Sequence, residues 1–289
     1  MPMLLIEGEY RPLNTEPDGD SLRFYPNDPS QWTLLPGPHR VRPNTHGGAQ
    51  MRFDGIDALE THYPTHGGGF GTVHQPLKFG HEAAQEVLHW LGFTHIVRDA
   101  DERVTAIQPQ QVPGYILSRS ADKYGRCVAF IFKGHAPAAS GTQIRFGVAE
   151  LHKSLNYHLL QQGLAYPTYY SKLYPDIRNE MTKAVQTARQ SKGLWHDDVT
   201  NSGFVFQNAQ TIFDTAVILP KLFRRLMDYL AINDGSTSLA GFVPYLAARD
   251  DRMFILSTGH STGFDFIVKV TGQKLELTNP PEDLVFIEG

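Results

Sequence analysis

The stretch Met51 to Glu60, MRFDGIDALE, combines a strand pattern with charged residues at the end of that strand. Arg52 and the apolar residues beside it favour a strand, and Gly55 permits close approach to the backbone. Asp57 and Glu60 follow where the strand should end. Two carboxylates three residues apart suit a hard cation, and an arginine just upstream suits the phosphate that such a cation would hold. Alternatively, the Asp-x-x-Glu pattern is only a turn with solvated charges, because short motifs have low specificity.

Other motifs accompany this stretch in a definite order. The sequence DGDS at residues 18–21 precedes it, and DKYGR at 122–126 leads into the apolar run CVAFIF. QQGLAYPTYY at 161–170 and a long helical pattern ending in GLW at 193–195 complete the series. In this order the motifs resemble the staphylococcal nuclease (thermonuclease) family, from about Leu4 to Trp195.

The resemblance implies an α+β fold, an oligonucleotide-binding (OB-fold) five-stranded β-barrel with three helices packed against it. We predict a nuclease-like domain over residues 1–200. A smaller α+β region of unknown role is predicted over 201–289, with one helix and several short strands. No apolar stretch is long enough to span a membrane.

Periodicity, glycine and proline predict the elements. Strands are expected at 4–10, 21–25, from 51, and at 103–107, 114–118 and 127–132, and helices at 80–91, 148–162 and 175–193. Residues 62–74 contain Gly67, Gly68, Gly69 and Gly71 and are expected to form a mobile lid. A polar linker at 196–203 precedes a helix from Pro220 to about Asn233 and strands at 252–256, 264–270, 274–278 and 284–287.

The resemblance also implies a metal site. In the family two aspartates and one backbone carbonyl hold a calcium ion, and these positions correspond to Asp20, Asp57 and Ala58. The carbonyl position is a threonine in the family's best-known member. A backbone ligand tolerates alanine there, although the lost hydroxyl could loosen the site. The expected cofactor is therefore Ca²⁺.

Three further residues match the catalytic positions of the family. Glu60 corresponds to the proposed general base, and Arg52 and Arg126 correspond to the two arginines that grip the phosphate. Physical chemistry supports these roles, because a cation and two planar, permanently charged groups stabilise the charge that spreads over the phosphoryl oxygens in the transition state. The alternative for these residues is a structural network of salt bridges.

A nucleotide-binding edge is implied as well. Lys123 and Tyr124 match positions beside the terminal phosphate of a bound nucleotide, and Tyr169 matches an aromatic residue beneath the base. Tyr170 and Tyr166 are candidates for the same work, with packing at the barrel rim as the alternative. Because every base has a π-face, such platforms imply little sequence preference.

Composition limits the partners. The 289 residues carry a formal net charge of −4, which argues against binding of nucleic acid through bulk positive charge. The single cysteine, Cys127, excludes an internal disulfide framework. With no signal peptide visible in MPMLLIEGEY, a cytoplasmic location is expected, or secretion if a signal was trimmed.

The sequence therefore predicts an enzyme, a calcium-dependent nuclease that hydrolyses DNA, with RNA left open, at low sequence specificity and with 3'-phosphate products. The alternative is a catalytically silent OB-fold module that binds nucleic acid or protein. An interaction role for the C-terminal region is compatible with either. Because a nuclease inside a cell endangers its own genome, we expect residues 204–289 or the glycine-rich lid to restrain the site.

Overall fold

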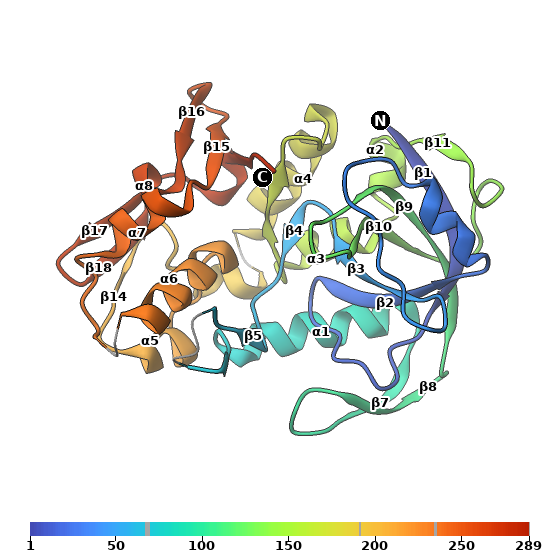
Figure 1. Ribbon diagram of the computed structural model, residues 1–289, viewed down its shortest axis with the longest axis horizontal. Helices are drawn as coiled ribbons and strands as arrows, with labels where there is room; N and C mark the ends of the chain where they lie inside the picture. Colours follow the sequence, from blue (N-terminus) through green and yellow to red (C-terminus); the bar gives the residue numbers. More distant parts are fainter. Residues whose placement is uncertain (67–69, 191, 234–235, 289) are drawn as a thin grey trace. The chain divides into compact units, whose positions relative to one another are not determined.

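The computed structural model describes residues 1–66, 70–190, 192–233 and 236–288 (Figure 1). The chain divides into two compact units. Unit 1 consists of Met1–Ile56, Ala83–Leu159 and Tyr174–Glu180, and unit 2 of Asp57–Glu82, Leu160–Leu173 and Met181–Gly289. The boundaries fall within β4 (Ile56–Asp57), α1 (Leu77–Leu91), α3 (Leu155–Gln162) and α4 (Pro175–Ala188).

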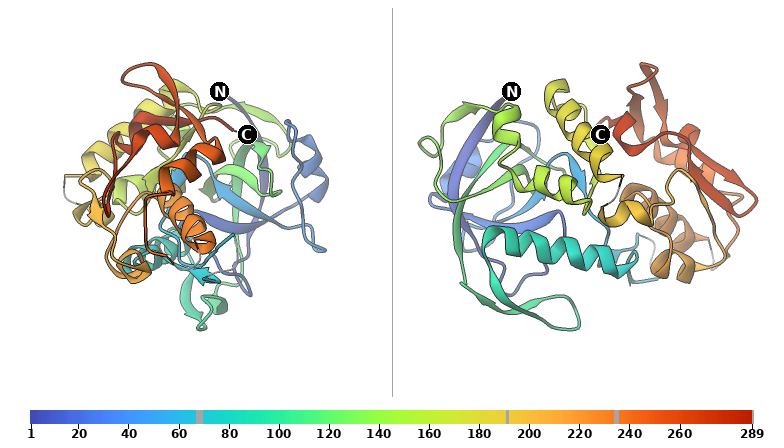
Figure 2. Two further views of the ribbon diagram at one scale, coloured as in Figure 1. Left: turned by 60° about the vertical axis from the view of Figure 1, so that its left-hand side comes forward. Right: turned by 180° about the vertical axis from the view of Figure 1, so that it is seen from behind.

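Unit 1 contains a closed β-barrel, visible from further directions in Figure 2. Its five strands are β1 (Pro2–Tyr10), β2 (Ser21–Pro26), β3 (Ala49–Phe53), β10 (Cys127–Lys133) and β9 (Val112–Ala121), in that spatial order. Pairing of β1 with β9, for example Leu5 with Leu117, closes the ring. The β3–β10 pair is parallel and the other pairs are antiparallel. This barrel confirms the predicted OB-fold α+β class.

Apolar side chains from all five strands fill the barrel. Phe24, Met51, Phe130 and Ile131 are fully buried. Tyr10 is also buried, and its hydroxyl donates to the carbonyl oxygens of Tyr115 and Phe132, both at 2.9 Å. A buried hydroxyl needs such partners.

Shorter elements complete unit 1. They are the 3₁₀ helix η1 (Pro29–Leu34), the hairpin of β7 (Thr94–Arg98) and β8 (Val104–Gln108), β11 (Gln143–Arg145), which extends the barrel sheet beside β1, and α2 (Val148–Leu151). The single helix predicted at 148–162 is wrong, because α2 ends and α3 begins anew. Ser154 accounts for the break, since its hydroxyl donates to Leu151 O at 2.6 Å and accepts from Tyr157 N at 3.2 Å.

The buried Asn156 of α3 fixes this helix to the barrel. Its side-chain amide donates to the carbonyl oxygens of Asp54 (2.9 Å) and Ala129 (3.1 Å), and its side-chain oxygen accepts from Ile131 N (3.0 Å). Asp54 directly follows β3, and the other two partners belong to β10. The end of β3 is therefore joined to α3 by one of these hydrogen bonds, and β10 is joined to α3 by the other two.

The larger sheets of unit 2 have four and three strands, and β5 (Tyr63–Pro64) pairs with β6 (Thr72–Val73) in a further two-stranded sheet. The four-stranded sheet has the order β13 (Tyr169–Tyr170), β19 (Leu284–Phe286), β15 (Arg252–Ile255), β16 (His260–Gly263), and the three-stranded sheet has the order β14 (Phe204–Val205), β18 (Lys274–Leu277), β17 (Val268–Thr271). The remaining elements are β12 (Tyr166–Pro167), η2 (Gly193–His196), α5 (Ala209–Asp214), α6 (Pro220–Ile232), α7 (Phe242–Arg249), α8 (Phe264–Ile267) and η3 (Pro281–Asp283). No helix in the described residues is both long and apolar enough to cross a membrane.

The strand predicted at 264–270 is wrong over its first half, where α8 forms before β17. Gly263 is extended and precedes α8, and Asp265 lies in the first turn, where a negative charge favours a helix. The predicted helix from Pro220 and the strands at 252–256, 274–278 and 284–287 are confirmed with small shifts in their bounds. The glycines 67–69 of the predicted lid lie outside the described residues.

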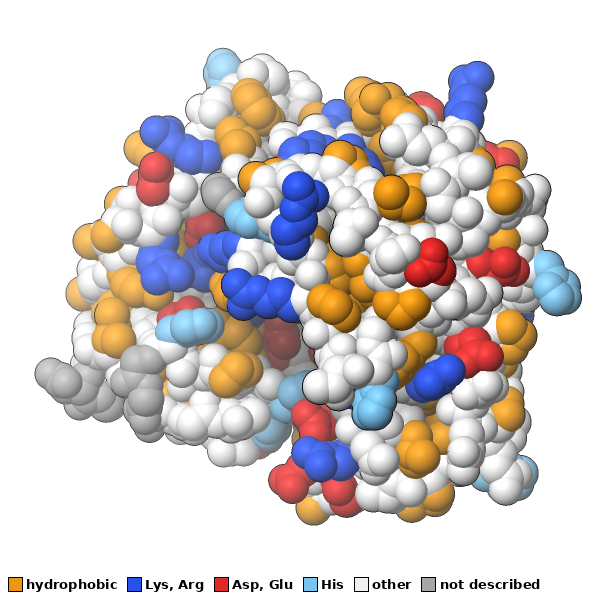
Figure 3. All heavy atoms as spheres, turned by 45° about the vertical axis from the view of Figure 1, so that its right-hand side comes forward, with side chains coloured by type: hydrophobic (Ala, Val, Ile, Leu, Met, Phe, Trp, Pro, Cys, Tyr) orange, Lys and Arg blue, Asp and Glu red, His pale blue; other side chains and the backbone are white. Residues whose placement is uncertain are grey.

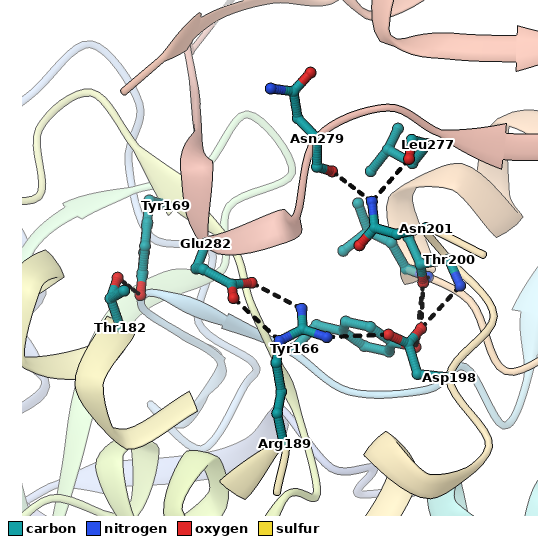
Figure 4. Close-up of polar contacts among 11 residues, drawn as sticks. Tyr166, Tyr169, Thr182, Arg189, Asp198, Thr200, Asn201, Leu277, Asn279 and Glu282 are labelled. Carbon is teal, nitrogen blue, oxygen red and sulfur yellow. Dashed lines mark hydrogen bonds and ion pairs between the residues drawn. The ribbon is translucent and has the colours of Figure 1, made fainter. Parts of the chain in front are cut away.

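The predicted domains 1–200 and 201–289 remain a prediction. Within unit 2, long-range contacts join earlier segments to the C-terminal region. The strands β13 and β19 pair in parallel, with Tyr169 opposite Val285. Arg189 donates to Glu282 at 3.0 and 2.8 Å and to Asp198 at 3.2 Å (Figure 4).

Candidate functional site

The register of three neighbouring strands positions the predicted site residues of unit 1. Arg52 on β3 lies opposite Ser21 of β2 and Val128 of β10. Because side chains alternate along a strand, Arg126, two residues before Val128, belongs to the same face as Arg52. Asp20 directly precedes β2 and forms an ion pair with Arg52. The barrel therefore brings Asp20 and Arg52 into contact and supports Arg126 on the adjacent strand.

A tight turn fixes Arg126. Asp122 accepts from the backbone N–H groups of Tyr124 (3.0 Å) and Arg126 (2.9 Å), and its other oxygen accepts from Arg126 Nε at 2.7 Å. Gly125 has a φ of +88°, a backbone conformation that favours glycine. The Asp-Lys-Tyr-Gly-Arg motif is thus a turn that orients the arginine through its own aspartate.

Lys123 and Tyr124 lie on the outside of this turn. Tyr124 is 59% exposed, and both Lys123 Nζ (5.4 Å) and Arg126 Cζ (5.7 Å) lie near its ring centroid. An exposed ring between two cations suits stacking and phosphate contacts. The nucleotide-binding role of Lys123 and Tyr124 remains a prediction.

Unit 2 carries the other predicted catalytic and metal residues. The chain leaves β3 through a turn in which Gly55 has a φ of +79°, and β4 then ends at Asp57. Asp57 is fully buried. Its two carboxylate oxygens accept from Arg224 on α6, at 3.1 Å from Nη1 and 2.7 Å from Nη2. Nη1 also donates to Glu60.

A second contact of α6 lies one helical turn further along. The carboxylate of Asp228 accepts from the Tyr63 hydroxyl, at 3.1 Å to each oxygen, and from the backbone N–H of His66 at 3.0 Å. Asp228 is buried, and burial together with this carboxylate raises the pKa of Tyr63. The beginning of the predicted lid is therefore attached to α6.

Gln75 joins the two ends of this loop. Its backbone N–H donates to Glu60 O at 2.8 Å, and its side-chain oxygen accepts from Glu60 N at 3.2 Å. Its side-chain amide donates to Ile218 O at 2.8 Å, just before α6. The backbone of Glu60 is thus fixed on both sides.

The predicted base-stacking residues lie in unit 2. Tyr169 is fully buried, and its hydroxyl lies 2.9 Å from the Thr182 hydroxyl (Figure 4). Tyr166 is fully buried and donates to Asp198 at 2.8 Å. Tyr170 is half-buried, with its ring centroid 6.0 Å from that of Phe286. The nucleotide-binding roles of Tyr169 and Tyr170 remain predictions, and stacking by Tyr169 requires its ring to become exposed.

Calcium can be tested against these contacts. Carboxylate oxygens are the ligands that calcium prefers, so Asp20 and Asp57 fit by chemistry. Each nevertheless faces a guanidinium in this structure, Asp20 that of Arg52 and Asp57 that of Arg224. Across the described residues, no three histidine, cysteine, aspartate or glutamate side chains are grouped as a metal would require. Binding to Asp57 would therefore require Arg224 to move. Ala58 is buried, as a backbone ligand would allow.

A small closed barrel of five strands with helices beside it defines the OB-fold class of α+β proteins. Both acidic and basic side chains lie on the face drawn in Figure 3, in keeping with the low net charge. A family model described as staphylococcal nuclease homologue matches residues 50–197, just over half of the chain, and the chain belongs to this family. No curated protein matches the chain. Family members are generally nucleases and typically depend on calcium.

Sequence analysis missed Arg224 and Asp228. Both lie in the predicted helix from Pro220, spaced four residues apart and therefore on the same side of it. The available signal was an arginine and an aspartate at this spacing in a helix whose remaining residues are mostly apolar. The pattern alone does not identify their partners, which lie more than 160 residues earlier in the chain.

Proposed function

We propose that this protein is a calcium-dependent nuclease that hydrolyses phosphodiester bonds of DNA, with little sequence preference and with 3'-phosphate products. The supporting observation is the strand register that places Arg52, Asp20 and the Arg126 turn on neighbouring strands of a staphylococcal nuclease barrel. The carboxylates of Asp20 and Asp57 and the carbonyl of Ala58 would hold the ion. When bound, the ion supplies positive charge that stabilises the developing phosphorane.

The residues of the chain account for the remaining chemistry. Glu60 accepts a proton from the attacking water as the water oxygen bonds to phosphorus. Arg52 and Arg126 donate hydrogen bonds to the phosphoryl oxygens, whose negative charge increases in the transition state. The bond from phosphorus to the 5'-oxygen breaks, and the departing oxygen takes a proton from solvent, which leaves a 3'-phosphate and a 5'-hydroxyl. Lys123, Tyr124, Tyr169 and Tyr170 would bind the nucleotide.

Two substitutions test these roles. Glu60→Gln removes the proton acceptor and Arg126→Ala removes one phosphate donor, and each should reduce the rate of plasmid digestion in calcium by about 10²-fold or more. Arg145→Ala on β11 removes the same charge from a position with no predicted role and should leave the rate unchanged. Digestion by Glu60→Gln or Arg126→Ala at the wild-type rate would contradict the assignment.

A second candidate function is a catalytically silent module that binds nucleic acid. The pairing of Arg224 with both Asp57 and Glu60 favours it, because a guanidinium then occupies the carboxylate that would act as the general base. Binding of labelled DNA and RNA by the wild-type protein, with no cleavage in calcium and none after Arg224→Gln, would support the silent module. Cleavage that a chelator abolishes would support the nuclease.

A further inference from the structure

One guanidinium serves two carboxylates at the end of β4. Arg224 binds Asp57 through both of its terminal nitrogens and Glu60 through one of them. Two-point pairing of a planar guanidinium with a carboxylate is a strong and directional contact. It directs hydrogen-bond donors at both oxygens of Asp57, the oxygens that a cation would use.

Helix α6 also binds residues that come after Glu60 in the chain. Asp228, one turn after Arg224, binds Tyr63 and the backbone of His66. We call this set of contacts the α6 clamp, formed by Arg224 and Asp228 on one side and residues 57–66 on the other. Buried apolar residues pack the helix into unit 2, namely Leu222, Phe223, Leu226, Met227 and Leu230. The two charged residues of the α6 clamp therefore project from a helix whose apolar side is buried.

We propose that Arg224 is an internal competitor for the cation, so that metal binds at Asp57 only when the guanidinium withdraws. This inference rests on the proposed roles of Asp57 and Glu60. From the sequence we expected residues 204–289 or the glycine-rich lid to restrain the site, and this inference assigns that restraint to the side chain of Arg224. A guanidinium and a divalent ion cannot occupy the same carboxylate oxygens, and without Arg224 the buried Asp57 would gain most from a new cation.

Competition of this kind lowers the apparent affinity for the ion. The affinity measured for the whole chain equals the intrinsic affinity multiplied by the fraction of molecules in which Arg224 has withdrawn. Typical coupling between two competing states changes affinity by about 5-fold to 150-fold. Removing the guanidinium should therefore tighten calcium binding by about tenfold or more.

The test is a calorimetric calcium titration of the full chain as wild type, Arg224→Gln and Arg225→Gln. Arg225 is the matched control, because it is the next residue on α6 and pairs with Asp251 through its Nε and Nη2 atoms. Both variants lose one positive charge; Arg224→Gln loses ion pairs to Asp57 and Glu60, and Arg225→Gln loses the ion pair to Asp251. Arg224→Gln should bind calcium about tenfold more tightly or better, and Arg225→Gln should bind as the wild type does.

Two more variants keep the result decisive. If Arg224→Gln does not fold, Arg224→Lys retains the charge, loses the two-point geometry, and should still tighten binding several-fold. In the double variant Arg224→Gln with Asp57→Asn the gain should disappear. Equal affinity of the wild type and the Arg224 variants, together with Glu60-dependent cleavage, would overturn the competition and leave the nuclease standing. No calcium binding and no cleavage in any form would overturn both.

Discussion

Each of the three acidic residues with a predicted role at the site forms an ion pair with an arginine in this structure. Asp20 pairs with Arg52, and Asp57 and Glu60 pair with Arg224. A guanidinium that contacts a carboxylate is itself held ready for a phosphate, because the two anions have similar oxygen spacing.

The DGDS, RFDGIDALE and DKYGR motifs led to the proposed catalytic residues one by one, and the roles of these residues remain predictions. The motifs are local, since each is a turn next to a strand and its spacing reflects that turn. Arg224 could not be predicted in this way, because its partners precede it by 164 and 167 residues. Nor did the sequence show that Tyr169 is buried, since an aromatic residue in a short strand can face either the core or a ligand.

Cys127 offers a prediction at the same scale. The thiol is fully buried on β10 and donates to Ser118 Oγ at 3.2 Å, and burial raises its pKa to about 12. Because only the thiolate reacts, the folded protein should be essentially inert to a thiol reagent at pH 8 and should react fully in denaturant. The measurement is the rate of colour formation with a disulfide reagent. Rapid reaction of the native protein would contradict the burial of this thiol.

Among the elements, α6 combines apolar packing with a second ion-pair cluster. Lys221 and Arg225 both contact Asp251, which follows α7, with Lys221 Nζ at 3.1 Å. The two cations hold the pKa of Asp251 well below its usual range, while burial lowers that of Lys221 to about 8. Asp251 therefore neutralises two partly buried positive charges at the start of the helix that carries Arg224.

Asp251→Asn should lower the free energy of unfolding by about 3 kcal/mol at pH 7, because it leaves Lys221 and Arg225 without their carboxylate. Since the folded-state pKa of Asp251 is depressed, its contribution is complete above the unfolded pKa, begins to fall below about pH 3.8, and is lost as pH falls through the folded-state pKa. Denaturant titrations at pH 7 and pH 3 measure the difference. A difference between wild type and variant that does not shrink at pH 3 would contradict this role.

Periodicity predicted the barrel strands and the long helices, because each has one buried face. The elements that were missed include α5, α7 and β16, none of which exceeds eight residues. Short elements carry little periodic signal, and local hydrogen bonds decide them. Asn208 is an example, since its side chain accepts from Thr211 N and caps α5.

For the whole molecule, each compact unit is made of segments that are far apart in the sequence. The family and the barrel were predictable, because their motifs are local and stand in a fixed order. The division near residue 200 follows a change in composition. Composition does not record that β13 pairs with β19 or that Arg189 binds Glu282, and such contacts place 57–82 and 160–173 with the C-terminal region.

A chain that ends at Asp198 should therefore be less stable than the full chain. It lacks β19, Glu282 and α6, and so removes the partners of Tyr169, Arg189 and Asp57. We expect its melting temperature to fall by about ten degrees or more, because several buried contacts are lost together. Differential scanning calorimetry of both chains measures the change. An unchanged melting temperature would show that residues 1–198 fold independently.

We expect water to hydrolyse phosphodiester bonds, with Glu60 as the proton acceptor, once Arg224 has released Asp57 and Glu60. The most direct measurement is the initial rate of plasmid cleavage against calcium concentration for wild type, Arg224→Gln, and Arg224→Gln combined with Glu60→Gln. We predict half-maximal cleavage by Arg224→Gln at a calcium concentration about tenfold lower than for the wild type, and almost none by the double variant. Cleavage by the double variant that equals that of Arg224→Gln, or the same calcium dependence in wild type and Arg224→Gln, would contradict this expectation.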